Sequence, residues 1–355
     1  MVSNERDEKK LYNNYNTDDK ILQDLKNGKE KPWREKKIKT LTLADSFKRL
    51  DYEKKSNRVR FCGSALAFLR NIETGEKCLK SANFCRERLC PMCQWRTSIK
   101  VFHQVSKVMD IAEKKYKNYV PIFLTLSVKN CKGEDLYSTL DVIFAGLRNL
   151  FTHRKFQRIA KGLFRALEVT YDGDEVISET RYKKYKKTYD NKGIHVGDKN
   201  LNYDTFHPHI HMVLLVDKSY FKGEDYMQTV EWVQMWRKAA KLDYDPVCDI
   251  RKVKTNKGKH KAVAEVAKYT LKDSEFLVNN NDITDRLVSI LSKALRGRRL
   301  YAFGGVFKEI AKELDMAEPD KGDLVHIDDE SVREDVATVL EIYRWNFGFA
   351  NYIKE

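Results

Sequence analysis

The stretch His207-Pro-His-Ile-His-Met-Val-Leu-Leu-Val216 decides the fold, because it combines a strand pattern with side chains that bind metals. Residues two apart on a β-strand point to the same face. His209 and His211 therefore project together, and Ile210 points into the opposite layer. The apolar run that begins at Met212 indicates a buried central strand. We interpret this segment as a pair of metal ligands on the central strand of a sheet.

Two further segments outside the histidine stretch also predict strands. They are Val120-Pro-Ile-Phe-Leu-Thr-Leu-Ser-Val128 and Leu163-Phe-Arg-Ala-Leu-Glu-Val-Thr-Tyr171, both rich in apolar and β-branched residues. Helical spacing is found over residues 95–116, 134–161, 224–241, 259–280 and 284–315, the last with a break at Gly304-Gly305, and near 332–343. Strands and helices do not alternate regularly, so we expect an α+β fold with an antiparallel sheet rather than a doubly wound parallel one.

Two imidazoles do not complete a site for a divalent cation, and a third ligand, expected to be oxygen, is needed. Glu168 is the first choice because it interrupts an apolar strand, where a lone carboxylate is costly without a partner. A hairpin would bring its strand beside the histidine strand. His207 would lie on the same face of the strand as His209 and His211, so it stays open as the alternative ligand.

A tyrosine nucleophile is suggested by the segment from Ala262 to Lys272. Glu265 and Tyr269 are four residues apart and would share one face of a helix. Lys268 and Lys272 would lie on a neighbouring face. A phenol becomes a nucleophile when a metal polarises the phosphate and a cation lowers the phenol pKa, and a carboxylate one turn away can serve as a general base. Taken alone, this pattern is also typical of a solvated helix.

The cysteines suggest a second metal site. Cys90-Pro-Met-Cys93 is a C-x₂-C knuckle that can present two thiolates to Zn²⁺. Cys85 lies close before it, and a tetrahedral structural site needs four ligands. We choose Cys62 as the fourth and keep Cys78 in reserve. A redox pair or ordinary thiols are the alternatives.

Composition sets the class of partner. The 355 residues include 67 Lys and Arg against 52 Asp and Glu, for a formal charge of +15, and such an excess indicates a polyanion such as DNA or RNA. The seven cysteines are an odd number, so disulfides are not expected. There is no apolar run long enough for a membrane span and no secretory signal pattern, so we expect a cytoplasmic protein with no membrane partner.

Basic residues near the motifs are the expected DNA contacts. Arginines surround the cysteines, and a second group, Arg296-Gly-Arg-Arg-Leu-Tyr301, lies within the pattern 284–315. A lysine- and tyrosine-rich stretch, 181–189, could also hold phosphates and stack bases, although each group could equally be a solvated face. The contact residues that we expect are Arg86, Arg88, Arg96, Lys272, Arg296, Arg298 and Arg299.

Four segments in this order resemble the rolling-circle replication initiators (Rep proteins) of small Gram-positive bacterial plasmids, within the HUH endonuclease superfamily. The segment FLTLS at 123–127 resembles the first motif of the family and HPHIH at 207–211 its metal-binding motif. The segment 265–269 resembles the motif that carries the nucleophilic tyrosine, and FCRERLCPMCQWR at 84–96 resembles the cysteine segment of one subgroup. The resemblance covers residues from about 62 to 308.

The resemblance implies a fold and a mechanism. The fold is an HUH-type antiparallel sheet of about five strands flanked by helices, with Mg²⁺ or Mn²⁺ at the histidines. Tyr269 would attack an origin phosphate, leaving a 5′-phosphotyrosine link and a 3′-OH that primes a host polymerase. Glu265 would activate the water that ends the cycle. The partners implied are plasmid origin DNA, presented as a single strand or hairpin, and a host helicase and DNA polymerase. A homodimer is one assembly to test.

We divide the chain into a flexible basic arm (1–45), a cysteine-rich zinc module (46–100), a nicking domain (101–280, with an insertion at 172–204) and a helical C-terminal region (281–355). Two rival functions stay open. One is a relaxase or transposase with the same chemistry. The other is a zinc-containing DNA-binding regulator without catalysis, which would need neither His209 nor His211.

Overall fold

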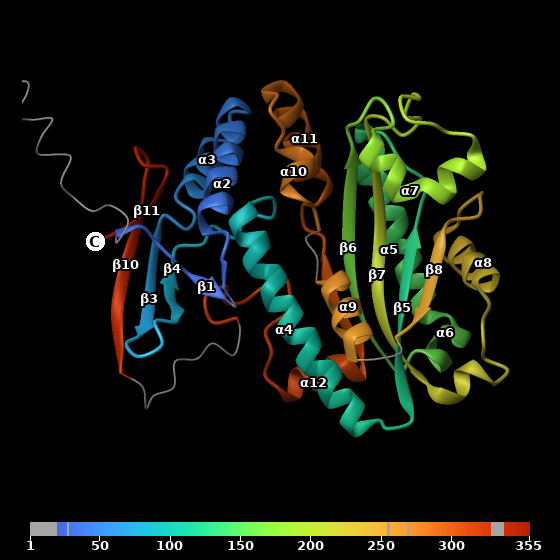
Figure 1. Cartoon of the computed structure of the whole chain (residues 1–355). Coiled ribbons are helices and arrows are strands. Elements are labelled where there is room, and N and C mark those ends of the chain that lie inside the picture. Colours follow the sequence, from blue (N-terminus) through green and yellow to red (C-terminus); the bar gives the residue numbers. More distant parts are fainter. Residues whose placement is uncertain (1–19, 27, 254–255, 268–269, 328–336) are drawn as a thin grey trace, which may run out of the picture.

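Two antiparallel sheets organise the chain, and the long helix α4 (Pro91–Lys115) lies between them (Figure 1). The computed structural model describes residues 20–26, 28–253, 256–267, 270–327 and 337–355. In this part of the chain, no helix has the length and apolar character that crossing a bilayer requires. Two very short strands, β1 (Leu25–Lys26) and β2 (Lys29–Glu30), form a separate hairpin.

The larger sheet has five strands in the order β8-β5-β7-β6-β9, and every neighbouring pair is antiparallel. The α+β architecture with an antiparallel sheet is therefore confirmed. The histidine strand β7 is central and almost entirely buried, as its apolar run predicted. The strands are β5 (Tyr119–Ser127), β6 (Gly162–Asp172), β7 (Thr205–Asp217), β8 (Cys248–Lys252) and β9 (Tyr301–Gly305).

Strand β9 corrects the mostly helical segment, with a break at Gly304-Gly305, that we expected over 284–315. Only α11 (Asn281–Ala294) and α12 (Val306–Glu313) are helical, and β9 pairs with β6 between them. Gly304 and Gly305 lie opposite Leu163 and Gly162. Gly305 has a φ of +54°, and a Cβ there would collide with the Lys161 carbonyl. Two glycines weaken a helix and permit this close approach of the chain to β6.

Helices α4, α9 and α12 pack together, and α9 and α12 lie against strands β6, β7 and β9. A second group, in which α5 packs on α6 and α8, contacts β7 and β8. These helices lie within or overlap the segments where helical spacing predicted them. The second group and the connecting turns are η2 (Gly133–Asp135), α5 (Leu136–Thr152), α6 (Arg154–Ile159), η3 (Lys218–Phe221) and α8 (Thr229–Ala240).

The helix expected over 259–280 is interrupted. Helix α9 (Asn256–Val266) ends early, and only the short α10 (Asp273–Phe276) follows. Between them the backbone N–H of Val169 donates to the Thr270 carbonyl at 2.8 Å. This bond holds the chain along β6, so it cannot continue as a helix there.

The smaller sheet has the order β11-β10-β3-β4 and joins segments from opposite ends of the sequence. The segments 46–100 and 281–355 therefore share one sheet, and they are not separate regions as we had divided them. The expected helix near 332–343 and the helical C-terminal region are wrong for residues 338–354, which form strands. The elements are β3 (Ala65–Asn71), β4 (Lys77–Ala82), β10 (Thr338–Asn346) and β11 (Asn351–Lys354).

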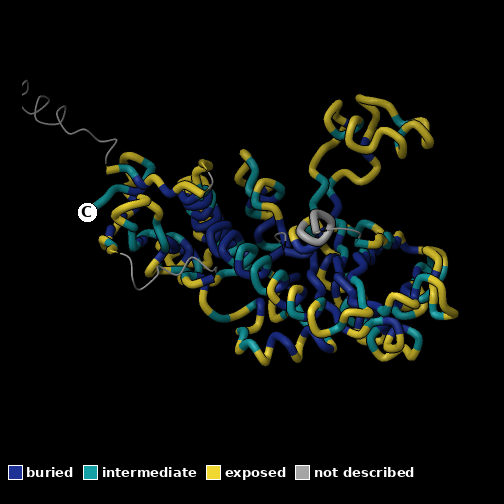
Figure 2. The backbone as a smooth tube through the Cα atoms, turned by 60° about the horizontal axis from the view of Figure 1, so that its bottom comes forward, coloured by how far each residue is buried: buried dark blue, intermediate teal, exposed yellow. Residues whose placement is uncertain are grey.

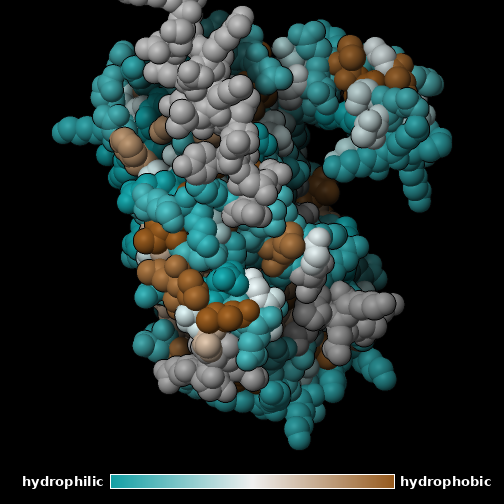
Figure 3. All heavy atoms as spheres, turned by 60° about the vertical axis from the view of Figure 1, so that its left-hand side comes forward, coloured by the Kyte–Doolittle hydropathy of each residue, from teal (hydrophilic) through white to brown (hydrophobic). Residues whose placement is uncertain are grey.

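An inverted polarity in β10 explains this error. Glu341 is only 4% exposed, and it pairs with Arg70 and Lys354 from the neighbouring strands, whereas Leu340 and Ile342 are 49% and 37% exposed. The inward side chain is charged and the outward ones are apolar, so the usual strand signal is reversed. Figure 3 shows apolar atoms gathered on this side of the molecule.

Residues 33–45 are not part of a flexible arm, as we had expected. They belong to helix α2 (Trp33–Arg49), which is followed by α3 (Glu53–Arg60). Trp33, Lys37, Thr40 and Phe47 are at most 2% exposed and recur at helical spacing. Lys37 and Thr40 are polar, so the helical spacing of the buried face could not be recognised as an apolar pattern in the sequence. Residues 1–19 of the proposed arm lie outside the described residues.

The insertion 172–204 carries helix α7 (Glu179–Lys192), none of whose residues is buried. Figure 2 shows mostly exposed backbone projecting from the body of the protein. Arg181 fixes its base by donating two hydrogen bonds to the Asp172 carboxylate, at 2.6 and 2.5 Å. The insertion is therefore an ordered projection from the ends of β6 and β7.

Candidate metal centres

The first candidate centre lies where β6 and β7 run side by side. Glu168 is directly opposite His209 in the register of the two strands. One carboxylate oxygen of Glu168, Oε2, lies 2.9 Å from His211 Nε2 and 3.3 Å from His209 Nε2. The sheet therefore brings together the two imidazoles and the carboxylate that we expected, and the three ligand atoms lie within 4.8 Å of one another.

Other hydrogen bonds orient both histidine rings. The Thr125 hydroxyl on β5 lies 3.0 Å from His211 Nδ1, and the His207 carbonyl lies 3.1 Å from His209 Nδ1. Each ring therefore uses Nδ1 for the protein and turns Nε2 toward Glu168. Such partners fix the tautomer and the direction of metal-binding histidines.

The electrostatics of Glu168 match a carboxylate that stays ionised. Burial would raise its pKa, but hydrogen bonds and charge from His209 and His211 outweigh burial and hold the pKa well below its usual range. Two imidazole nitrogens and one carboxylate oxygen are a suitable donor set for a divalent cation with further positions open to other ligands. The residues present therefore fit a metal.

His207 is near this group but not part of it. Its ring stacks on His209 with the centroids 5.2 Å apart, and burial together with His209 lowers its pKa to about 4. The three residues whose ligand atoms converge are Glu168, His209 and His211. Between the two third ligands that we left open, this geometry favours Glu168.

Glu265 on α9 approaches the same group, with Oε1 3.9 Å from His211 Nε2. Tyr269 and Lys268, the expected nucleophile and its neighbouring cation, lie outside the described residues. The residue that follows them, Thr270, is buried and accepts the hydrogen bond from Val169, which is next to Glu168 in sequence.

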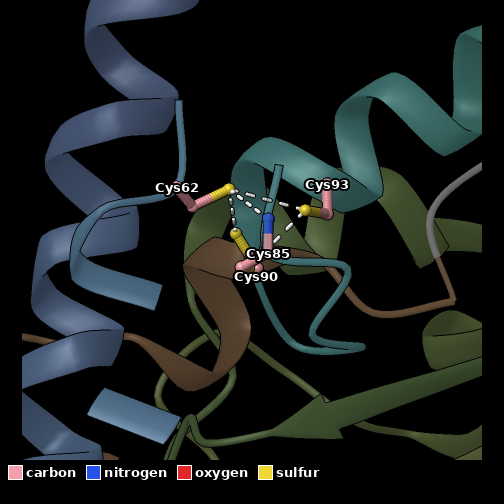
Figure 4. A group of neighbouring side chains, drawn as sticks. All are labelled: Cys62, Cys85, Cys90 and Cys93. Carbon is pink, nitrogen blue, oxygen red and sulfur yellow. Dashed lines mark hydrogen bonds between the residues drawn. The ribbon is translucent and has the colours of Figure 1, made fainter. Parts of the chain in front are cut away.

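The second candidate centre consists of Cys62, Cys85, Cys90 and Cys93, whose sulfurs converge (Figure 4). The sulfur of Cys62 lies 3.5 Å from that of Cys93 and 3.6 Å from that of Cys90, and the Cys85 and Cys93 sulfurs are 3.7 Å apart. Tetrahedral Zn–S bonds of about 2.3 Å place sulfurs about 3.8 Å apart, so this spacing fits one ion.

Backbone N–H groups around the cysteines stabilise the negatively charged thiolate form. The N–H groups of Cys85, Arg86 and Glu87 donate to the sulfurs of Cys62, Cys93 and Cys85, at 3.3, 3.2 and 3.4 Å. Cys90 is the N-cap of α4, where the helix dipole favours negative charge.

The thiols restrain one another's ionisation. The pKa of Cys93 is raised well above its usual value, because its thiol hydrogen-bonds to the sulfurs of Cys62, Cys85 and Cys90 and because burial and the charge of Cys90 disfavour a thiolate there. A divalent cation among the four sulfurs would remove this penalty, so the donor set fits a metal. Cys78 is not in the group.

The basic residues expected at DNA have different surroundings. Arg96 is 3% exposed and donates to the carbonyls of Leu324 and Val325, and the side chain of Arg298 is 9% exposed and paired with Asp141. We therefore assign both to the structural core and not to a DNA surface. The other five expected residues lie at the surface or line a cavity. Arg86, Arg88 and Arg296 line a cavity, Arg299 pairs with Glu318, and Lys272 pairs with Glu275.

Two supporting residues were missed from the sequence. Thr125 is in the FLTLS segment, and its alternation along β5 could have placed it on the histidine face. Lys37 is fully buried, where its ammonium donates to the carbonyls of Arg60 and Cys62 at 2.7 and 2.8 Å. Burial lowers its pKa to about 8. No sequence signal could have linked Lys37 to the cysteines.

The fold and the two centres define an α+β protein with one open mixed-ligand site and one closed four-cysteine site. Residues 76–353 match the Rep_1 family, which is described as "Replication protein". The chain belongs to this family.

The relatives agree with this family. A "Protein rep" from Bacillus amyloliquefaciens is 36% identical over 97% of this chain and 99% of its own length. A "Protein rep" from Streptococcus pneumoniae serotype 2 is 36% identical over 94% and 95%, and one from Lentilactobacillus hilgardii is 33% identical over 94% and 98%. No solved structure matches the chain.

Proposed function

We propose that this protein initiates plasmid rolling-circle replication by nicking one strand of the origin with Tyr269, in an HUH-type site. The observation that carries the proposal is the convergence of Glu168, His209 and His211 on two central strands, with Thr270 hydrogen-bonded beside them. A sheet that buries a carboxylate between two oriented imidazoles forms a pre-organised cation site. The residue before Thr270 is the tyrosine that the chemistry needs.

Glu168, His209 and His211 would hold Mg²⁺ or Mn²⁺. When bound, the cation polarises the scissile phosphate and offsets charge that builds up on its oxygens. The protein's own contribution is orientation: Thr125 and the His207 carbonyl direct both Nε2 atoms to one point. Little rearrangement is then needed when the phosphate arrives.

In the nicking step, the Tyr269 oxygen forms a bond to phosphorus and the bond from phosphorus to the 3′-oxygen breaks. The phenol gives up its proton, with the Lys268 charge favouring the phenolate, and the departing oxygen takes up a proton. The products are a 5′-phosphotyrosine link and a free 3′-OH, which a host polymerase extends while a host helicase unwinds the duplex.

Glu265 would end the cycle. Its carboxylate is near His211 and half-buried, so it can accept a proton from a water that attacks the regenerated nick site. The water oxygen bonds to phosphorus, the bond to the 3′-oxygen breaks, and no second tyrosine is needed.

The cysteine centre would hold a structural Zn²⁺. Four sulfur ligands leave no position for a substrate, which is typical of structural zinc. It would fix the loop from Cys85 to Cys90 against Cys62 and the start of α4.

The test is covalent capture. The protein is incubated with Mn²⁺ and a single-stranded oligonucleotide that carries the nick region of the origin, and the products are separated on a denaturing gel. A protein–DNA adduct is expected for the wild type and should be absent in Tyr269→Phe, which should still bind DNA. Tyr226→Phe, a change at an exposed tyrosine, is the matched control.

An adduct that persists in Tyr269→Phe would remove this residue from its role. DNA binding without any adduct, under all metals tried, would favour the non-catalytic regulator. A relaxase or transposase would give the same adduct, so the class is decided by whether the intact gene supports autonomous plasmid replication and Tyr269→Phe abolishes it.

A further inference from the structure

A basic cavity of about 640 Å³ lies between the cysteine loop and the end of α11. Its walls come from the start of α3, from residues 86–89 and from the C-terminal turns of α11. Five cations line it, and Glu87 is its one acidic residue. The five are Lys55, Arg86, Arg88, Lys293 and Arg296.

Four of the five cations in this cavity are not ion-paired with any described residue, and the fifth, Lys55, pairs with Glu87. In the part of the chain that the structure describes, Arg86, Arg88, Lys293 and Arg296 have no carboxylate within ion-pairing distance. Glu87 is already engaged by Arg58 at 2.6 Å and by Lys55 at 3.7 Å. Cations gathered in a concave wall raise the local positive potential and attract an anion.

The size of the cavity favours a single strand over a duplex. A volume of about 640 Å³ is in the range of pockets that enclose a small ligand, which corresponds to a few nucleotide units and not to a double helix. Tyr52, 47% exposed, stands on the same wall and offers a ring on which a base can stack.

The cavity leads toward the Glu168 site. Arg86 and Arg88 also line a second cavity of about 180 Å³, whose lining includes Thr270, Tyr301 and Asp320. Thr270 accepts the hydrogen bond from Val169, next to Glu168. A strand whose phosphates follow the cations would therefore be directed from the α11 side to the site of nicking.

We infer that this cavity, here called the basic groove, binds the phosphates of the single-stranded DNA adjoining the nick site. The path of the strand toward the nick site depends on the proposed function. The binding of DNA phosphates by the cations of the groove does not depend on it. It assigns a DNA role to Lys55, Lys293 and Tyr52 and gives Arg86, Arg88 and Arg296 a shared site. The cysteine centre acquires a second role, because it holds one wall of the groove in place.

The experiment compares wild type with the double variant Lys293→Gln/Arg296→Gln. Both side chains are exposed on α11 or just after it, so the fold should tolerate the change. Binding to a labelled oligothymidylate of about 20 nucleotides is followed by fluorescence anisotropy over a salt series. We expect the Kd to rise about tenfold at low salt, and the slope of log K against log salt to fall by about 1.4, since each single-strand phosphate contact contributes about 0.7.

The matched control is Arg154→Gln/Lys238→Gln, which removes the same charge from exposed positions on α6 and α8. In Figure 1 these helices lie away from α11, on the other side of the larger sheet. The control should keep nearly the wild-type Kd and slope. This arm separates a local groove from a general effect of net charge.

Equal losses in the two double variants, or an unchanged slope in Lys293→Gln/Arg296→Gln, would overturn the groove. So would a defect confined to duplex DNA. Failure of the nickase proposal looks different: wild type would form no adduct, while the groove variant would still bind oligothymidylate more weakly than the control.

Discussion

The two candidate metal centres differ in how completely the protein surrounds them. The cysteine centre has four sulfurs drawn from three parts of the chain, three of them on buried residues, and backbone N–H groups donate to those sulfurs. The Glu168 centre has three ligands on two neighbouring strands, with Glu265 Oε1 3.9 Å from His211 Nε2. A closed shell holds a fold together, whereas an open one leaves positions for a substrate.

Their supports also differ. Backbone N–H groups of residues 85–87 donate to three of the sulfurs, and the Thr40 hydroxyl on α2 lies 3.6 Å from the Cys90 sulfur. At the other centre, His211 depends on a single hydroxyl, that of Thr125 from the next strand of the sheet, and His209 on the His207 carbonyl. The cysteine centre should therefore control whether its surroundings fold, and the Glu168 centre should control activity in a protein that is already folded.

The largest effect should come from removing a cysteine ligand. Cys93→Ser should abolish zinc binding and lower stability by more than about 5 kcal/mol, since binding at such sites contributes about 10 kcal/mol to folding. Zinc content of the purified protein and the thermal midpoint measure this. Cys78→Ser, a half-buried thiol outside the group, should retain one zinc and change stability by less than about 1 kcal/mol.

Equal zinc content in Cys93→Ser and Cys78→Ser would contradict the closed centre. If Cys78→Ser lost zinc and Cys62→Ser retained it, the fourth ligand would be Cys78 and not Cys62.

The next effect should come from the open centre. His211→Ala should reduce adduct formation by about 10³-fold or more, because the cation offsets several kcal/mol of developing charge, and should leave the zinc content unchanged. Excess Mn²⁺ should rescue little of this loss. His195→Ala, at an exposed histidine in the insertion, is the control and should nick normally. Wild-type nicking in His211→Ala would disprove the site.

Most of the larger sheet could be predicted because its strands are long and apolar. β7 and β6 were found from their apolar runs, and Glu168 was found because it interrupts one of them. The Glu168–His209 register could not be predicted, because pairing depends on the whole hairpin. Three of the four cysteines could be grouped from their short spacing in the sequence, whereas Cys62 is brought to them by the packing of α2 against α3 and α4.

Elements were missed where a charged or small residue occupies an inward position. Lys37 is buried on α2 because its ammonium finds two carbonyl partners, and Glu341 is buried on β10 because four side chains bond to it. Gly304 and Gly305 predicted only a break in a helix, whereas they are the last two residues of strand β9. In each case a tertiary partner that is distant in sequence overrides the local pattern.

A smaller effect should come from Thr125→Val, which removes the hydroxyl beside His211 Nδ1 while keeping the shape of the side chain. Loss of such a partner typically costs 10- to 100-fold in metal affinity or activity. We expect a higher Mn²⁺ requirement for nicking and an unchanged thermal midpoint. Thr125→Ser should restore the wild-type requirement. If both variants behaved alike, the Thr125 hydroxyl would have no part in orienting the ring.

The smallest effect should come from Glu341 in the smaller sheet, where a substitution should lower stability without changing nicking at the open centre. Glu341 joins all four strands of the smaller sheet: it accepts hydrogen bonds from Arg70 on β3, Tyr343 on β10 and Lys354 on β11, and it pairs with Lys77 on β4. Burial would raise its pKa, but these partners lower it to about 2 from an ordinary 4.5. Glu341→Gln should therefore cost about 1–3 kcal/mol at neutral pH.

The sign of the pH dependence follows from the direction of this shift. A carboxyl whose pKa is lowered by folding stabilises the protein above its unfolded pKa, and the stabilisation is lost as the pH falls through the folded value. The difference in unfolding free energy between wild type and Glu341→Gln should thus be constant above about pH 5 and shrink from 4.5 toward about 2. Denaturant melts of both proteins at each pH measure this difference.

Loss of metal in acid should affect wild type and Glu341→Gln alike. Nicking at neutral pH should be equal in both proteins, because Glu341 belongs to the smaller sheet and the nicking site to the larger. A difference that grew as the pH fell would show that the Glu341 carboxyl is held protonated in the folded protein.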